Sequence, residues 1–167
     1  MARKICYFSW RHGSTFLVTL GDIVSPSVVE WFSETCGISI SGIIGSLDNP
    51  SVANALRKHG FLLEGRLLEL NGLRFVGIGV STDVEEFTER IKTVDILLSY
   101  YPGVKYSCYK RGDPRIDVLA GSLKAKLVIY NSREPYFANY AFTPGSAWRG
   151  YVGLLDLETL KPAYMRV

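Results

Sequence analysis

Few side chains in this sequence could carry catalytic chemistry. The chain has only two histidines, His12 and His59, which excludes a multi-histidine metal centre within one chain. His59 lies in the basic segment 57–60, and we interpret it as a structural residue at a helix end, where the helix dipole favours a base. Cys108 has no histidine near it in the sequence, so thiol catalysis is not expected. The glycine-rich loop patterns that bind nucleotide phosphates are also missing.

One stretch interleaves basic and aromatic residues. Residues 105–112 read Lys-Tyr-Ser-Cys-Tyr-Lys-Arg-Gly, and Lys105, Lys110 and Arg111 could contact the backbone of a single-stranded nucleic acid while the tyrosines stack on bases. The alternative is a solvated loop with one packed tyrosine. Nucleic-acid binding is therefore one of three functions that we consider below.

The composition is that of a folded protein. The chain has 167 residues, of which 47% are hydrophobic and 21% are charged, and these values exclude a disordered or collagen-like chain. We expect a single domain over residues 1–167. The net charge of +3 permits an acidic partner without requiring one.

The location of the protein is predicted from its apolar runs and its cysteines. No apolar run approaches the ~18 residues of a membrane span, so no membrane association is expected. Cys6, Cys36 and Cys108 are too few and too scattered for a disulfide framework. A reducing, cytoplasmic location is therefore predicted.

The apolar runs predict strands that alternate with short helices. In the first half we expect strands over 4–9, 16–20 and 38–44, and helices over 27–35 and 51–59. Asn71-Gly72, between apolar runs at 66–70 and 73–80, predicts a hairpin. The second half predicts helices over 84–92 and 113–123, and strands over 94–100, 127–130, 140–143, 150–157 and 163–167. This order indicates a layered α/β/β/α sandwich of two mixed β-sheets flanked by helices.

A series of glycine-centred turns resembles the calcineurin-like metallophosphoesterase family, and the match extends in order over essentially the whole chain. Residues 17–24 resemble the strand and Gly-Asp turn of that family, and residues 42–50 are similar to its Gly-Asn-His/Cys-Asp turn. Residues 68–79 resemble the family hairpin, 94–103 its Asp-Ile-Leu-Leu-Thr-His segment, and 143–146 its Asn-Pro-Gly-Ser turn. Only nine residues separate His12 from Asp22, so the helix between the first two family strands is predicted to be deleted.

The resemblance implies a site that in the family holds two metal ions on histidines and carboxylates. Here most of those positions carry other residues. His12 and Asp22 match family ligands, Asp48 matches a supporting residue, and Glu134 is the one possible donor at the two His positions of Gly-His-x-His. The other matched positions carry non-ligating side chains: Trp10, Ser46, Leu47, Tyr100 and Ser132.

This residue set predicts a degenerate metal site. A dinuclear centre cannot be rebuilt from it, and at most one weakly bound Mn or Zn ion at His12, Asp22 and Asp48 remains conceivable. Bulky and uncharged side chains at the other positions would relieve the repulsion between carboxylates that lack cations. Arg11 and Arg133 either pair with Asp22 or Glu134 or lie in solvent.

We consider three functions, of which the first two follow from the family resemblance and the third from the stretch 105–112 and the mild basicity of the chain. The first is a catalytically inactive relative of the phosphoesterases that binds a protein partner or forms a homo-oligomer, by analogy with the calcineurin-like subunit of the retromer coat. The second is a metal-dependent phosphoesterase, a phosphatase or phosphodiesterase with an altered, mononuclear site. The third is the nucleic-acid-binding accessory protein described above.

Overall fold

The computed structural model of the chain describes residues 1–84, 90–105, 107 and 111–167. The helical segments are α1 (Ala2–Arg11), α2 (Pro26–Trp31), the π-helical turn η1 (Phe32–Cys36), α3 (Pro50–His59), α5 (Pro114–Ser122) and the short η2 (Ala147–Arg149). The strands are β1 (Phe16–Thr19), β2 (Ser39–Gly42), β3 (Phe61–Leu62), β4 (Leu67–Leu70), β5 (Leu73–Ile78), β6 (Ile96–Ser99), β7 (Leu127–Tyr130), β8 (Tyr136–Ala138), β9 (Ala141–Thr143), β10 (Tyr151–Leu155) and β11 (Pro162–Arg166).

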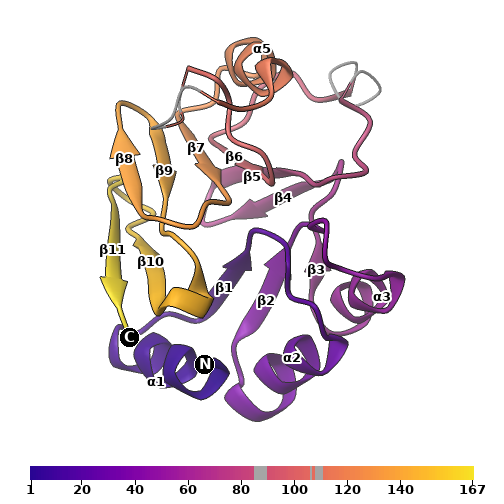
Figure 1. The fold of residues 1–167 in the computed structure, drawn as a ribbon, viewed down its shortest axis with the longest axis vertical. Helices are drawn as coiled ribbons and strands as arrows, with labels where there is room; N and C mark the ends of the chain where they lie inside the picture. The colour runs from indigo at the N-terminus through magenta and orange to yellow at the C-terminus, as the bar shows by residue number, and fades with distance from the viewer. Residues whose placement is uncertain (85–89, 106, 108–110) are drawn as a thin grey trace.

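The strands form a six-stranded sheet, a three-stranded sheet and a separate hairpin (Figure 1). The larger sheet is mixed and has the order β4-β5-β6-β7-β9-β8, whereas β1, β2 and β3 are parallel. The antiparallel hairpin β10-β11 is the last part of the chain. The expected two mixed sheets are therefore one mixed sheet, one parallel sheet and a hairpin.

Three apolar clusters hold these layers together. Between the two sheets lie Ile43 and Leu63 from one side and Phe75, Ile96 and Phe142 from the other. Helices α1 to α3 pack on the outer face of the small sheet, and α5 packs on the outer face of the large one. The predicted α/β/β/α sandwich is confirmed.

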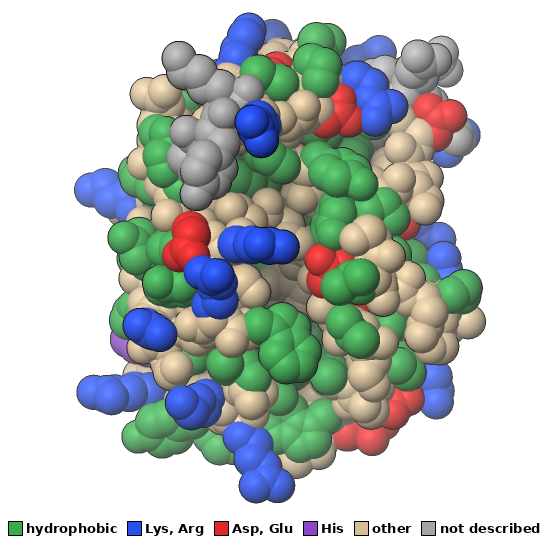
Figure 2. All heavy atoms as spheres, in the orientation of Figure 1, with side chains coloured by type: hydrophobic (Ala, Val, Ile, Leu, Met, Phe, Trp, Pro, Cys, Tyr) green, Lys and Arg blue, Asp and Glu red, His purple; other side chains and the backbone are tan. Residues whose placement is uncertain are grey.

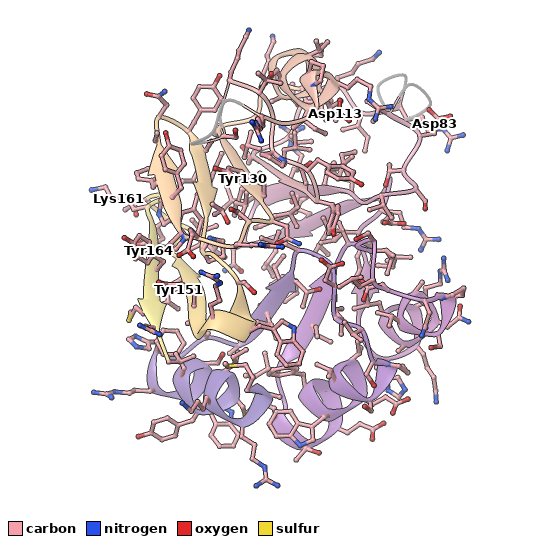
Figure 3. All side chains as sticks on the ribbon, in the orientation of Figure 1. Asp83, Asp113, Tyr130, Tyr151, Lys161 and Tyr164 are labelled. Atoms are coloured by element: carbon pink, nitrogen blue, oxygen red, sulfur yellow. A yellow bond between two sulfur atoms is a disulfide. The ribbon has the colours of Figure 1, made fainter. Side chains whose placement is uncertain are left out.

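Elements with strong local signals lie where the sequence predicts them. Helix α3 begins at Pro50 behind the cap Asn49, and α5 begins at Pro114 behind the cap Asp113, which is labelled in Figure 3. Asn71 and Gly72 both have positive φ, as a two-residue hairpin turn requires, and they join β4 to β5. The helix expected over 84–92 falls mostly on residues 85–89, outside the described residues.

The strand predicted over 4–9 is wrong, because these residues belong to helix α1. Ala2, Ile5, Cys6 and Ser9 recur at helical spacing and face the small sheet and its helices. The predicted deletion of a helix before Asp22 depends on a strand at 4–9, so it no longer follows.

The expectation of reduced cysteines is also wrong for two of the three. Cys6 of α1 and Cys36 of η1 form a disulfide. Both cysteines are buried in the apolar cluster under the small sheet. Their bond links α1 to η1 across a sequence separation of 30 residues. The predicted cytoplasmic location rests on reduced cysteines and loses that support.

No described helix is both long enough and apolar enough to cross a membrane.

Asp95 ties β6 to its neighbours through a nearly buried carboxylate. Its Oδ2 accepts a hydrogen bond from the Arg74 backbone N–H at 2.8 Å, and its Oδ1 lies 2.8 Å from the Lys126 ammonium. The hydrogen bond from Lys126 is the main reason that the pKa of Asp95 lies below its ordinary value. The ionised form of Asp95 therefore stabilises the fold.

We expect Asp95→Asn to lower the free energy of unfolding by about 1–3 kcal/mol at neutral pH. Because the pKa is lowered in the folded state, this contribution is fully present above the ordinary value of 3.8 and is lost as pH falls through the folded value. Urea denaturation at neutral pH and at about pH 3 measures it. The exposed Glu69→Gln is the control, and a deficit of Asp95→Asn that stays constant over this range would contradict the explanation.

Candidate functional site

The candidate site lies where strands of the two sheets end. The carboxyl ends of β1 and β2 and those of β6 and β7 converge in the middle of the molecule (Figure 1). Asp22 follows β1, Ser46 to Asp48 follow β2, and Tyr100 follows β6. Polar side chains at the carboxyl ends of parallel strands commonly form binding sites in α/β proteins.

The Asp22 carboxylate is the centre of this cluster. The Tyr100 hydroxyl donates a hydrogen bond to Oδ2 of Asp22 at 2.9 Å, and the Leu47 backbone N–H donates to Oδ1 at 3.0 Å. The Tyr100 hydroxyl oxygen also lies 2.8 Å from Ser46 Oγ. The structure thus brings together four residues that the sequence singled out, from three different turns.

The ring of Tyr100 packs directly on the backbone of two glycine turns. A Cβ at Gly45 would lie 2.7 Å from the ring carbon Cε2 and 2.3 Å from Oδ1 of Asp22. A Cβ at Gly21 would lie 2.9 Å from the ring carbon Cδ2. These contacts are shorter than a real Cβ tolerates, so the two glycines are what lets the tyrosine reach Asp22.

Partial burial raises the pKa of the Tyr100 phenol, and the hydrogen bond to the Asp22 carboxylate acts in the same direction. The phenol therefore keeps its proton at neutral pH. It acts as a donor to Asp22.

Asp48 binds backbone N–H groups of the turn after β1 and of the turn after β2. Its Oδ2 accepts from the N–H groups of Asp22 and Gly45, each at 2.8 Å, and its Oδ1 accepts from the N–H of Val24 at 2.7 Å. Asp22 and Val24 have positive φ values of 57° and 70°, which are costly for residues with a Cβ. The carboxylate of Asp48 compensates for this strain.

A further carboxylate, which the sequence analysis did not single out, lies near these turns. Oε1 of Glu64 accepts a hydrogen bond from the N–H of Ile44 at 3.1 Å. Burial raises the pKa of Glu64, and the charge of Asp48 adds to this effect. No sequence motif marks Glu64, because only the parallel pairing of β2 and β3 brings it to this edge.

The loop after β7 carries an ion pair. Glu134 forms an ion pair with Arg149 of η2, and the Arg133 carbonyl accepts a hydrogen bond from the Ser146 N–H at 3.1 Å. The partner of Glu134 is thus Arg149, which the sequence analysis did not single out. Arg133 is exposed and Ser132 is half-buried. Figure 2 shows this face of the molecule hollowed near its middle, with basic and acidic side chains beside the hollow.

Trp10, Arg11 and His12 are not brought to this site. They lie at the end of α1, before the amino end of β1, whereas Asp22 follows its carboxyl end. Trp10 donates its indole N–H to the Cys36 carbonyl at 3.1 Å, and the ring of His12 contacts the ring of Phe8 at a tilt of 45°, with centroids 4.4 Å apart. The helical conformation of residues 2–11 is the physical reason for this placement.

Two further predictions concern Leu47 and His59. Leu47 does not fill the site, because its side chain is 67% exposed and only its backbone contacts Asp22. His59 ends α3 as predicted, with Nδ1 at 3.3 Å from Oε1 of Glu34.

Of the basic and aromatic stretch 105–112, only part is described. Lys105 and Arg111 are exposed, and their backbone N–H groups bond to Asp117 and to Ser107 Oγ. Lys110 lies outside the described residues. Nucleic-acid binding by this stretch stays a prediction.

Two solved structures have a fold similar to that of this chain. No protein-family model and no curated protein matches the chain. A crystal structure of TT1561 of Thermus thermophilus is similar with a TM-score of 0.79 and 14% identity, covering 99% of this chain and 92% of that one. A structure described as a novel archaeal phosphodiesterase is similar with a TM-score of 0.64 and 14% identity, covering 99% and 91%. The chain has a phosphoesterase-like fold.

The residues present at the carboxyl edge of this phosphoesterase-like fold do not fit a pair of metal ions. The residues that donate to Asp22 are the non-ligating Tyr100 and Leu47, and Asp48 accepts hydrogen bonds from three backbone N–H groups. Across the described ranges, no three His, Cys, Asp or Glu side chains gather closely enough to hold a metal ion. The set His12, Asp22 and Asp48 is therefore not assembled, and only Asp22 and Asp48 come together.

Proposed function

We propose that this chain is a non-catalytic phosphoesterase-like domain that acts as a protein-binding module. The observation that carries the proposal is the Asp22 cluster. Hydrolysis with two metal ions needs several histidine and carboxylate ligands around the ions. Here the Asp22 carboxylate accepts hydrogen bonds from the Tyr100 phenol and the Leu47 N–H, and no three His, Cys, Asp or Glu side chains gather around it closely enough to hold a metal ion within the described residues.

Exposed aromatic side chains support the binding part of the proposal. Trp148, Tyr7 and Trp10 are 81%, 65% and 60% exposed. Aromatic residues are enriched in protein–protein interfaces, where they bury large areas at small entropic cost. Their exposure is consistent with a surface that a partner covers.

The metal content and turnover of the purified protein test the catalytic part of the proposal. After dialysis against Mn²⁺ or Zn²⁺, we expect bound metal well below one ion per chain. With an aryl phosphodiester and added Mn²⁺, we expect turnover no higher than that of Asp22→Asn, because no three possible metal ligands gather around this carboxylate within the described residues.

The exposed Glu158→Gln is the matched control, because it also removes one carboxylate charge. Stoichiometric metal together with turnover that survives in Glu158→Gln and is lost in Asp22→Asn would contradict the proposal. That result would establish a metal-dependent phosphoesterase with an altered site.

A further inference from the structure

A groove lies between the exposed face of α1 and the end of β11, apart from the Asp22 cluster. Its volume is about 680 Å³, within the range of small-ligand and side-chain pockets. We call it the α1–β11 groove and define it by its apolar floor, Phe8, Met165 and Val167, and by its basic rim, Arg3, Lys4, Arg11 and Arg166.

The floor of the groove is apolar and only partly covered. Phe8, Met165 and Val167 are all half-buried. The ring of Phe8 contacts the ring of His12 at a tilt of 45°, with ring centroids 4.4 Å apart. Met165 is a flexible side chain of the kind that adapts to apolar partners. An aliphatic side chain from outside would remove more of this floor from water.

The rim of the groove carries four basic side chains and no acidic one. Arg3, Lys4, Arg11 and Arg166 are all exposed, and no Asp or Glu lines the groove. Helix α1 itself contains no acidic residue. Within the part of the chain that the structure describes, none of these four side chains forms an ion pair.

The basic side chains stand out on the surface of the molecule. At the lower left of Figure 2, over α1 and the end of β11, Lys and Arg side chains lie among hydrophobic ones and acidic side chains lie elsewhere. The Arg166 guanidinium lies 5.9 Å from the ring of Tyr151, its pairing partner on strand β10, which is labelled in Figure 3. A patch of arginines and exposed aromatics such as Tyr7 has the composition of an interface hot spot.

We propose that the α1–β11 groove binds an acidic protein segment that inserts an aliphatic side chain onto the Phe8, Met165 and Val167 floor. The four rim cations attract the acidic groups, and the floor buries the aliphatic one. This inference rests on the proposed protein-binding function and identifies the chemistry of the partner.

The same groove suits a single-stranded nucleic acid less well. Such a ligand needs open aromatic faces on which successive bases stack. Phe8 is half-buried against the ring of His12, and Tyr7 is the one exposed Phe, Tyr or Trp side chain in the lining, which is too few for a series of stacked bases. Nucleic acid is therefore treated as a competing outcome of the experiment.

Fluorescence anisotropy with three labelled probes tests the inference. The probes are a peptide of Glu-Glu-Leu repeats, a matched peptide of Glu-Glu-Ser repeats, and an oligothymidylate of the same net charge. At about 50 mM salt, we expect the leucine peptide to bind about tenfold more tightly than the serine peptide, because it buries apolar area on the floor. The double variant Arg3→Glu with Arg11→Glu should weaken binding of the leucine peptide by about tenfold.

The double variant Lys58→Glu with Arg66→Glu is the control. It makes the same change in net charge at two exposed residues outside the groove, and it should bind like the unchanged protein. Circular dichroism of both double variants verifies that they are folded. A third variant, Met165→Ser, should reduce the preference for leucine over serine without changing any charge.

Four outcomes would overturn the inference. These are equal affinities of the two double variants, equal affinities of the two peptides, no binding of any probe, and tighter binding of oligothymidylate than of the leucine peptide. The last outcome would make the groove a nucleic-acid site. Failure of the proposed non-catalytic function is seen separately, as stoichiometric metal and turnover that depends on Asp22.

Discussion

Replacing Cys6 and Cys36 together by alanine is expected to lower the free energy of unfolding by about 3–4 kcal/mol. The disulfide closes a loop of 30 residues that contains β1 and α2, so it removes many conformations from the unfolded chain. It also joins α1 to η1 inside the apolar cluster under the small sheet. Urea denaturation under oxidising conditions measures the loss.

Reduction of the unchanged protein provides the matched control. A reductant should lower the stability of the unchanged protein toward that of the double alanine variant and leave the variant itself nearly unaffected. If the two proteins were equally stable under oxidising conditions, the disulfide would not stabilise the fold.

Replacing Asp48 by alanine is the second change with a large expected effect, about 2–4 kcal/mol of unfolding free energy. Three backbone N–H groups would lose a charged acceptor at once. Two of them belong to Asp22 and Val24, whose positive φ values would then lack compensation. Hydrogen exchange of the amides of Asp22, Val24 and Gly45 should accelerate in the same variant.

Asp48→Asn is the graded control for this prediction. The amide keeps one acceptor oxygen and loses the charge, so its loss of stability should be smaller than that of Asp48→Ala. Equal stability of Asp48→Ala and the unchanged protein would show that water replaces the carboxylate without cost, and the supporting role of Asp48 would be rejected.

The sequence predicts the elements whose signals are local. Asn71-Gly72 favours the two positive φ values of a hairpin turn whatever surrounds it. Asn49-Pro50 and Asp113-Pro114 each provide a side-chain cap and a preformed first turn for α3 and α5. These residues act on their own backbone, so a single sequence is enough to find them.

Helix α1 shows where local signals fail. The run Lys-Ile-Cys-Tyr-Phe-Ser favours a strand by composition, because it is rich in β-branched and aromatic residues. The helix is favoured by the burial of Cys6 and Ser9 and the partial burial of Ile5 on one face, and by the bond from Cys6 to Cys36. Both stabilising contacts join residues that are distant in sequence, so tertiary packing overrides the local preference.

The sequence by itself determined the layered α/β architecture and placed Asp22, Ser46, Asp48 and Tyr100 in turns that follow strands, since strand ends and glycine turns are encoded locally. Only the tertiary structure decided how those turns meet. It placed the Tyr100 phenol on Asp22, paired Glu134 with Arg149, and moved Trp10 and His12 away from the site. The physical reason is that hydrogen bonds, ion pairs and a disulfide between distant residues depend on how the sheets pack, and no local pattern in the chain specifies that packing.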